Sequence, residues 1–320
     1  MKISRTSPAK RGFTLMELMV AMAITTIIVT VLVSITSIAL DTWNRSRAEL
    51  RASRQGKSMV DSMARDFESL VSRRGNTNEW LSAIVSSTLP KLKSTTSANS
   101  TTSANACELI FFTAATDRYD GQIGTNTDKG GDVSCAGYIL ESKDPIVGTS
   151  GNFDTFVLNR LLVNPDDTFS QLLGKPDLVN AFSPFTTERA KTKYFVCENI
   201  YQFSLTFHVQ VSRVTGSGAS ATTALIDVPV TVGKNVSGQV IKEFRIQGSG
   251  LVAAVSGGLA TADELKAGRL TAVEISITVI TDFGIDQLRK RSDLANAAKQ
   301  ADFLTKNSYQ YTKLVQVPSM

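Results

Sequence analysis

The chain has 320 residues, of which 42% are apolar and 20% charged, with a formal net charge of +5 and a single histidine. Four of the positive charges lie on Lys2, Arg5, Lys10 and Arg11, so residues 13–320 carry a net charge of only +1. This near-neutral balance gives no general reason to expect a nucleic-acid partner, and one histidine leaves little for histidine-based catalysis.

The N-terminus consists of a basic leader, residues 1–12, followed by a long apolar run. Residues 18–40 contain no charged side chain. At about 1.5 Å rise per residue they form about 35 Å of helix, which is enough to cross a hydrocarbon core of about 30 Å. The leader contains no acidic residue, and this charge bias predicts that it stays on the cytoplasmic side of the membrane.

Two ordinary explanations compete for this segment. A secretory signal has an apolar region of about 7–15 residues and a cleavage site between small residues, which Ser37-Ile38-Ala39 could imitate. The run is too long for that, and it begins one residue after Glu17. A plain signal anchor explains the length but leaves the carboxylate without a role, and an ionisable group in a membrane segment is usually functional.

The stretch Arg11-Gly12-Phe13-Thr14-Leu15-Met16-Glu17 resembles the N-terminus of type IV prepilins and of the pseudopilins of type II secretion. The resemblance implies cleavage between Gly12 and Phe13 by a prepilin peptidase, followed by N-methylation of Phe13. It also implies that Glu17 pairs with the N-terminal amine of a neighbouring subunit during filament assembly. Such a pair relieves two charges that are each costly in hydrocarbon.

The same resemblance implies partners and location. The expected partners are the prepilin peptidase, other pilins or pseudopilins bound through the N-terminal helix, an inner-membrane assembly platform and membrane lipid. The expected location is the inner membrane, crossed once, with the head in the periplasm until the chain is extracted into a filament.

The apolar segment, residues 13–40, is predicted to continue as an amphipathic helix over residues 41–72, giving a helix of roughly 55 residues. No proline occurs between Pro8 and Pro90, and Ser34 stands where many major pilins have a proline, so no kink is expected. An apolar stripe is expected at Met59, Val60, Met63, Phe67, Leu70 and Val71. A solvated face is expected at Asp61, Arg65, Asp66, Glu68 and Arg73.

A basic cluster lies in the first part of this amphipathic segment. It comprises Arg45, Arg47, Arg51, Arg54 and Lys57, interrupted by Glu49. We interpret it as the end of the helix next to the membrane, where long basic side chains reach lipid headgroups or acidic neighbours in a filament.

Residues 73–320 are predicted to form a periplasmic or extracellular head. Residues 93–106 are of low complexity, with the sequence Thr-Thr-Ser-Ala-Asn at 95–99 and again at 101–105, and are expected to form a surface loop outside the core. Beyond them, short apolar or alternating runs bounded by turn residues predict strands at 108–112, 137–140, 153–163, 194–211, 240–246 and 270–280. One long helix with a mostly antiparallel sheet is an α+β architecture.

Two of these strands extend the resemblance. Residues 199–205 and 268–275 are similar to paired strands of the J-type minor pseudopilins and W-type minor pilins, although Leu270-Thr271 replaces the usual Leu-Pro. The long head and the low-complexity insert are also similar to the pilin-like proteins labelled Verru_Chthon cassette protein C.

No enzymatic motif stands out, and the chain is not expected to be an enzyme. His208 lies on the polar side of an alternating strand, where a solvated side chain is the ordinary outcome. Asp263 and Glu264 are adjacent acids without a second cluster to complete acid–base chemistry.

No cofactor is expected, although calcium remains an open alternative. Acidic and amide side chains are concentrated in a Gly-rich loop, and oxygen-rich loops can hold this ion. Their spacing does not match an EF-hand, and turns use the same residue types. The residues are Asp117, Asp120, Asn126, Asp128 and Asp132.

Three cysteines allow at most one intramolecular disulfide. The favoured pair is Cys107 with Cys135, because they bracket one long loop. Cys107 and Cys197 each adjoin an apolar strand, so a role as small buried side chains remains open.

The sequence therefore predicts a minor pilin or pseudopilin: a non-enzymatic subunit of a pilus-like filament or a type II secretion pseudopilus. An adhesin or DNA-uptake tip that uses the filament as a carrier is the main alternative. A membrane-anchored periplasmic enzyme is a more distant one.

Overall fold

The computed structural model describes residues 14–73, 75, 77–85, 88–95, 100–114, 132–151, 153–215, 222–234, 240–253 and 259–318. The chain divides into two units, Met1–Glu49 and Leu50–Met320, and we call the second unit the head. The architecture is α+β, as predicted.

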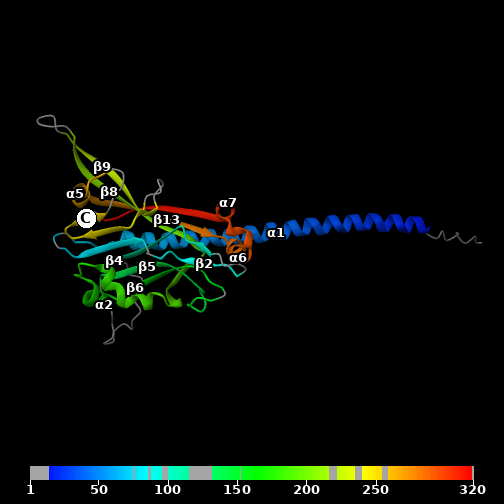
Figure 1. Cartoon of the computed structure of the whole chain (residues 1–320), viewed down its shortest axis with the longest axis horizontal. Helices are drawn as coiled ribbons and strands as arrows, with labels where there is room; N and C mark the ends of the chain where they lie inside the picture. The colour runs from blue at the N-terminus through cyan, green and yellow to red at the C-terminus, as the bar shows by residue number, and fades with distance from the viewer. Residues whose placement is uncertain are drawn as a thin grey trace, which may run out of the picture. The chain divides into compact units, whose positions relative to one another are not determined.

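Helix α1 (Leu15–Glu68) has 54 residues and contributes to both units (Figure 1). This agrees with the predicted helix of roughly 55 residues, which the absence of proline permits. In the first unit the described side chains of residues 14–47 are all exposed. In the head, α1 buries one stripe that includes Met59, Met63 and Phe67.

The head contains fourteen strands in its described residues. They are β1 (Glu79–Val85), β2 (Lys91–Lys93), β3 (Ser100–Thr102), β4 (Asn105–Thr113), β5 (Ser134–Lys143), β6 (Thr155–Val163), β7 (Phe195–Glu198), β8 (Ile200–Thr215), β9 (Thr222–Lys234), β10 (Val240–Ile241), β11 (Glu243–Gln247), β12 (Gly250–Ala253), β13 (Arg269–Ile280) and β14 (Ser308–Gln316). The predicted strands coincide with β4, β5, β6, β7–β8, β10–β11 and β13.

Twelve of these strands form one sheet with two sections. One section runs β12–β11–β1–β4–β5–β6–β7 and the other runs β10–β9–β8–β13–β14. They join where the start of β4 pairs in parallel with β8, at Asn105↔Gln202 and Ala106↔Phe203. The other strand pairs described are antiparallel, so the predicted sheet type is confirmed.

The main core lies between α1 and this sheet. Alternation in β8 turns Phe203, Leu205, Phe207 and Val209 inward, as the sequence predicts, and all four are fully buried. Phe67 of α1 stacks on a ring of β4 with a centroid separation of 4.7 Å. Burial of this apolar surface supplies the main driving force for holding the second half of α1 on the sheet.

The predicted solvated face of α1 is wrong at Asp66. This residue is 2% exposed and faces the sheet. Its carboxylate accepts two hydrogen bonds from Arg160 of β6, both 2.7 Å long, and one of 2.6 Å from the Tyr138 hydroxyl of β5. Burial and the Asp66 carboxylate raise the pKa of Tyr138, so this hydroxyl stays protonated and donates.

A second layer covers the opposite face of β1, β4, β5 and β6, with α2 visible beside β6 in Figure 1. Short helical turns form it: α2 (Pro165–Asp167), the π-helical turn η1 (Thr168–Leu172), α3 (Leu178–Phe182), η2 (Ser183–Phe185), α4 (Thr186–Arg189) and η3 (Thr192–Tyr194). Phe182 lies against Gly137 of β5, where a Cβ atom would come within 2.4 Å of its ring. The missing side chain of Gly137 therefore gives this cover its close approach to the sheet.

The C-terminal region carries α5 (Ala262–Ala267), α6 (Asp282–Lys290), η5 (Ser292–Ala295) and α7 (Ala297–Asn307). The last strand, β14, pairs with β13 along its full length. Its Tyr311 lies over Gly56, the single glycine of α1, where a Cβ atom would come within 2.5 Å of the ring. The first helix and the last strand of the head are therefore in direct contact.

The predicted low-complexity surface loop at 93–106 is wrong for its second repeat. Thr101, Ser103, Asn105 and Ala106 are buried, and Asn105 and Ala106 begin β4. Backbone pairing with β8 and polar bonds such as Ser103 Oγ to the Tyr201 carbonyl, 2.6 Å, incorporate these small residues into the head. Residues 96–99 lie outside the described part of the chain.

Candidate functional site: the N-terminal helix

The described part of the N-terminal site begins at Thr14, so Gly12 and Phe13, the predicted cleavage and methylation residues, lie outside it. Glu17 is exposed, and its Oε2 accepts hydrogen bonds from the Thr14 backbone N–H and hydroxyl, each 2.9 Å long. Thr14 Oγ1 in turn accepts from the Glu17 N–H at 3.2 Å. These reciprocal bonds form a capping box that satisfies donors at the start of α1.

The capping box gives the Glu17 carboxylate two donors within its own chain. Sequence reasoning missed the role of Thr14, although Thr followed three residues later by Glu is the pattern of such a cap. The arrangement keeps the carboxylate hydrogen-bonded at the beginning of the apolar run.

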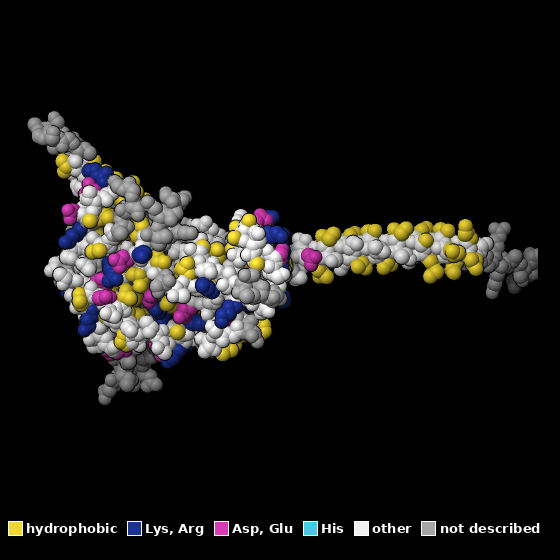
Figure 2. All heavy atoms as spheres, in the orientation of Figure 1, with side chains coloured by type: hydrophobic (Ala, Val, Ile, Leu, Met, Phe, Trp, Pro, Cys, Tyr) yellow, Lys and Arg dark blue, Asp and Glu magenta, His cyan; other side chains and the backbone are white. Residues whose placement is uncertain are grey.

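In the described residues, α1 is the one helix that is long and apolar enough to cross a membrane. Apolar side chains line the described part of α1 in the first unit, as Figure 2 shows. Threonine hydroxyls in this run donate to the carbonyl four residues earlier at 2.8 Å, as Thr25 does to Ala21 and Thr30 to Thr26. Each hydroxyl is thus satisfied within the helix, as a hydrocarbon environment requires.

The basic cluster divides between two roles. Arg51 binds Glu198 at 2.7 Å and Asp282 at 3.0 Å, and so ties α1 to β7 and α6 within the head. Arg45, Arg47, Arg54 and Lys57 are exposed. Their predicted contact with headgroups or acidic neighbours stays a prediction.

The titratable residues singled out in the head have structural partners. His208 Nδ1 lies 2.8 Å from Asp227 Oδ2, and its Nε2 lies 3.8 Å from Glu274 Oε2, across neighbouring strands. Glu264 caps α5 by accepting from the Thr261 N–H at 2.8 Å.

Glu264 also pairs with Arg213, and this partner lowers the pKa of its carboxyl to about 2. Its neighbour Asp263 lies in the first turn of α5 and adds no second acid to this pair. The pairing with Arg213 accounts for the lowered pKa of Glu264, and no catalytic role is needed to explain it.

Metal binding finds no support in the described residues, where no group of three or more His, Cys, Asp or Glu side chains could hold an ion. Asp132 is exposed. The other members of the suggested calcium loop lie outside the described residues, so calcium there stays a prediction. They are Asp117, Asp120, Asn126 and Asp128.

The structure contradicts the predicted disulfide between Cys107 and Cys135. All three cysteines are free and buried. Cys107 belongs to the core beneath α1, whereas Cys135 belongs to the separate core beneath the α2–α4 cover. The sheet thus stands between the two sulfur atoms, and burial raises the pKa of both thiols.

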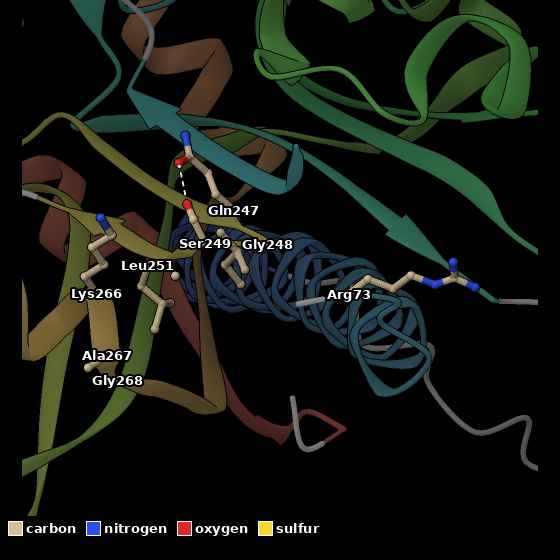
Figure 3. Close-up of a pocket in the computed structure, with 10 residues that line it drawn as sticks. Arg73, Gln247, Gly248, Ser249, Leu251, Lys266, Ala267 and Gly268 are labelled. Atoms are coloured by element: carbon tan, nitrogen blue, oxygen red, sulfur yellow. Dashed lines mark hydrogen bonds between the residues drawn. The ribbon is translucent and has the colours of Figure 1, made fainter. Parts of the chain in front are cut away.

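The pocket drawn in Figure 3 has a volume of about 150 Å³ and lies at the turn between β11 and β12. Gln247 and Ser249 bond to each other there at 3.3 Å. Arg73 and Lys266 are its charged lining residues, and Figure 3 shows Arg73 extending away from the turn. Without converging acidic, basic or nucleophilic groups, this pocket offers no catalytic arrangement.

A buried polar layer beneath the α2–α4 cover was not expected from the sequence. Arg189 is 2% exposed, pairs with Glu108 at 2.6 Å and stacks its guanidinium 5.2 Å from the Phe182 ring centroid. In the same layer, Trp80, Ser82 and Asn159 each place a polar atom without a hydrogen-bond partner among the described residues. A buried arginine 81 positions from its acid leaves no short-range pattern in the sequence.

Residues 7–33 match the family model described as the prokaryotic N-terminal methylation motif. Searches of curated proteins and of solved structures gave no match. The motif lies at the start of α1, a helix long and apolar enough to cross a membrane, in a chain with an α+β head. The motif and this helix support the type IV pilin and pseudopilin family, whose members are structural subunits. The J-type and W-type resemblance stays a prediction.

Proposed function

We propose that this protein is a minor pilin or pseudopilin, a filament subunit that prepilin peptidase cleaves between Gly12 and Phe13 and that is then N-methylated at Phe13. The observation that carries this proposal is the methylation motif at residues 7–33, placed at the start of a 54-residue helix whose first part is apolar. The helix is held in the inner membrane until the assembly platform transfers it to a filament.

In this proposal Glu17 changes partners during assembly. In the isolated chain its carboxylate is bonded to Thr14. In the filament it accepts from the methylated amine of a neighbouring subunit, which compensates two charges at once. The 271 residues of the second unit form a large head, which favours a place at the tip or on the side of the filament over the shaft.

The test is intact-mass and N-terminal peptide analysis of the protein purified from its own membranes. The proposal expects a chain that begins with N-methyl-Phe13. A Glu17→Ala variant should be processed but fail to enter filaments, whereas Glu49→Ala, at another exposed acid of α1, should be incorporated normally. A chain that retains Met1, or that begins after Ala39, would contradict the proposal.

The second candidate is an adhesin or DNA-uptake tip carried on the filament. The hairpin of β8 and β9 favours it, because Val214 and Leu225 are exposed on one face of its outer part. Substituting both with serine should abolish surface or DNA binding by assembled filaments if this candidate holds. Unchanged binding together with lost assembly would assign the hairpin to contacts between subunits.

A further inference from the structure

One end of the head is defined by Arg51, near the residue at which α1 enters it. Arg51 bonds Asp282 at the start of α6 and Glu198 at the end of β7. Asn199 directly follows Glu198 in the chain, and its φ of 63° is unusual for a residue other than glycine. Its amide donates to Asp282 Oδ1 at 2.7 Å. We call this region the Arg51 end.

The β5–β6 loop lies at the same end. Thr155, the first residue of β6, donates to Asn199 Oδ1 at 2.6 Å. Just before it, the Phe153 carbonyl accepts from Arg289 of α6 at 2.9 Å, and the Asp154 carbonyl is bonded to the same guanidinium. The loop and α6 are therefore fixed to one another and to the Arg51 end.

Four large apolar side chains point into solvent from this loop and from α6. Ile146 is 87% exposed, Val147 68% and Phe153 70%, and Phe283, next to Asp282, is 54% exposed. A soluble surface tolerates single exposed apolar residues, but four of them on two joined segments indicate an interaction surface. We call these four residues the apolar rim.

The acidic side chains of α6, of η5 and of the loop have partners at this end. Asp282 is paired with Arg51, Asp286 with Lys290 at 2.7 Å, and Asp293 with Arg291 at 2.6 Å. The Asp144 carboxylate accepts from the Ile146 N–H at 2.8 Å within the loop. The described part of the loop and of α6 thus carries no excess of basic side chains, and the exposed basic side chains near this end, such as Arg47 and Arg54, belong to α1.

Chain connectivity brings this surface close to lipid. Ten residues separate Leu40, the end of the uncharged run, from Arg51. Even fully extended, that segment reaches only about 40 Å, so the Arg51 end remains near the membrane that holds α1. An apolar rim tethered at this range meets lipid at a high effective concentration.

We propose that the apolar rim inserts into the interfacial layer of the membrane that holds α1, so that the head rests on the bilayer before the subunit is extracted. The proposal rests on the membrane anchoring in the proposed function. Aromatic and branched apolar side chains are suited to the level between headgroups and acyl chains. Because the loop and α6 carry no excess of basic side chains, insertion of the rim itself is driven by apolar burial.

The test uses the full-length chain in liposomes, with an environment-sensitive fluorophore at Ile146→Cys. The native cysteines are poor labelling targets because they are buried, and burial raises the pKa of Cys197 to about 12. The matched control is Leu225→Cys, which replaces an exposed apolar residue of the distant β8–β9 hairpin. The label at position 146 should be quenched by brominated lipid and protected from aqueous iodide, whereas the label at 225 should behave in the opposite way.

Lipid composition and salt complete the experiment. Protection at position 146 should be present in phosphatidylcholine alone, should persist in high salt, and should be lost in a Phe153→Ser/Phe283→Ser variant. Equal iodide access at 146 and 225 in a correctly inserted chain would overturn this inference and leave the proposed function intact. Protection that arises only after filament assembly would assign the rim to a neighbouring subunit and would also overturn it.

Discussion

Asp66 of α1 and Arg160 of β6 are joined by two parallel hydrogen bonds of 2.7 Å in the interior of the head. The pair fixes the rotation of α1 about its axis, because the carboxylate reaches the guanidinium in one orientation only. An apolar stripe alone would tolerate small rotations. The pair thus adds specificity to the packing of the second half of α1.

Removal of one partner should be costly. Asp66→Ala removes the carboxylate that accepts from the largely buried Arg160 guanidinium and from the Tyr138 hydroxyl, and we expect it to lower the free energy of unfolding by about 3–5 kcal/mol. Chemical denaturation of the full-length chain in detergent measures this. The matched control is Asp61→Ala, at an exposed residue of the same helix that pairs with Lys313 of β14. It should have a much smaller effect. Equal losses in the two variants would contradict a special role for Asp66.

Glu108 and Arg189 allow a double-mutant test beneath the α2–α4 cover. Glu108→Ala alone should destabilise the head by about 3–5 kcal/mol, because Arg189 stays buried without its acid. Glu108→Leu combined with Arg189→Met should restore most of this stability, since apolar side chains of similar volume need no compensation. A double variant as unstable as the single one would show that the pair contributes more than its own desolvation costs.

Gly56 should not accept even a methyl group. Alanine favours a helix by about 1 kcal/mol over glycine, but overpacking against Tyr311 costs about 1–3 kcal/mol, so Gly56→Ala should be destabilising by up to about 2 kcal/mol. In a Tyr311→Ala background the same substitution should become neutral or stabilising. Thermal unfolding of the four variants gives the coupling between the two positions. Additive effects would rule out the steric explanation.

The pairing of Glu264 with Arg213 predicts that the stability of the head depends on pH. The hydrogen bonds from Arg213 lower the pKa of Glu264 from 4.5 to about 2 in the folded protein. A group with a lowered folded pKa stabilises above its unfolded pKa and loses this contribution as pH falls to its folded pKa. The midpoint of thermal unfolding should therefore be lower for Glu264→Gln than for the native chain at pH 7, and the difference should vanish near pH 2. A constant difference would contradict the assignment.

Local patterns predicted the parts of the fold that depend on local information. The alternation over Phe203, Leu205, Phe207 and Val209 identified β8 and its buried face correctly. The unbroken helix followed from the absence of proline. Strand β14 was missed because its alternation, Tyr309, Tyr311, Lys313 and Val315, includes a charged residue whose stem packs at an edge. Strand β9 was missed because it contains Pro229, and proline argues against a strand. The strand tolerates Pro229 because it lies near the sheet edge.

Contacts between residues far apart in the sequence could not be predicted from local patterns, either at the candidate site or in the core. Glu17 and the cleavage motif are visible within seven residues, whereas the Asp66 partner lies 94 positions away. A closer reading of the helix could have placed Asp66 inside, because it lies three residues after Met63 and four before Leu70, on the apolar stripe. The cysteine prediction failed because the sequence does not reveal which face of a sheet a side chain takes after a long loop.

The contact between Gly56 and Tyr311 also governs when the head can be completed. It joins the first helix of the head to its last strand, and contacts of such large sequence separation form late because loop closure must precede them. In the proposed function the head folds beyond the membrane, so this stretch of α1 would stay uncovered until residues 308–316 have been translocated. Completion of β14 would then report full translocation, and an interrupted chain would remain unfinished and open to proteases on the far side of the membrane.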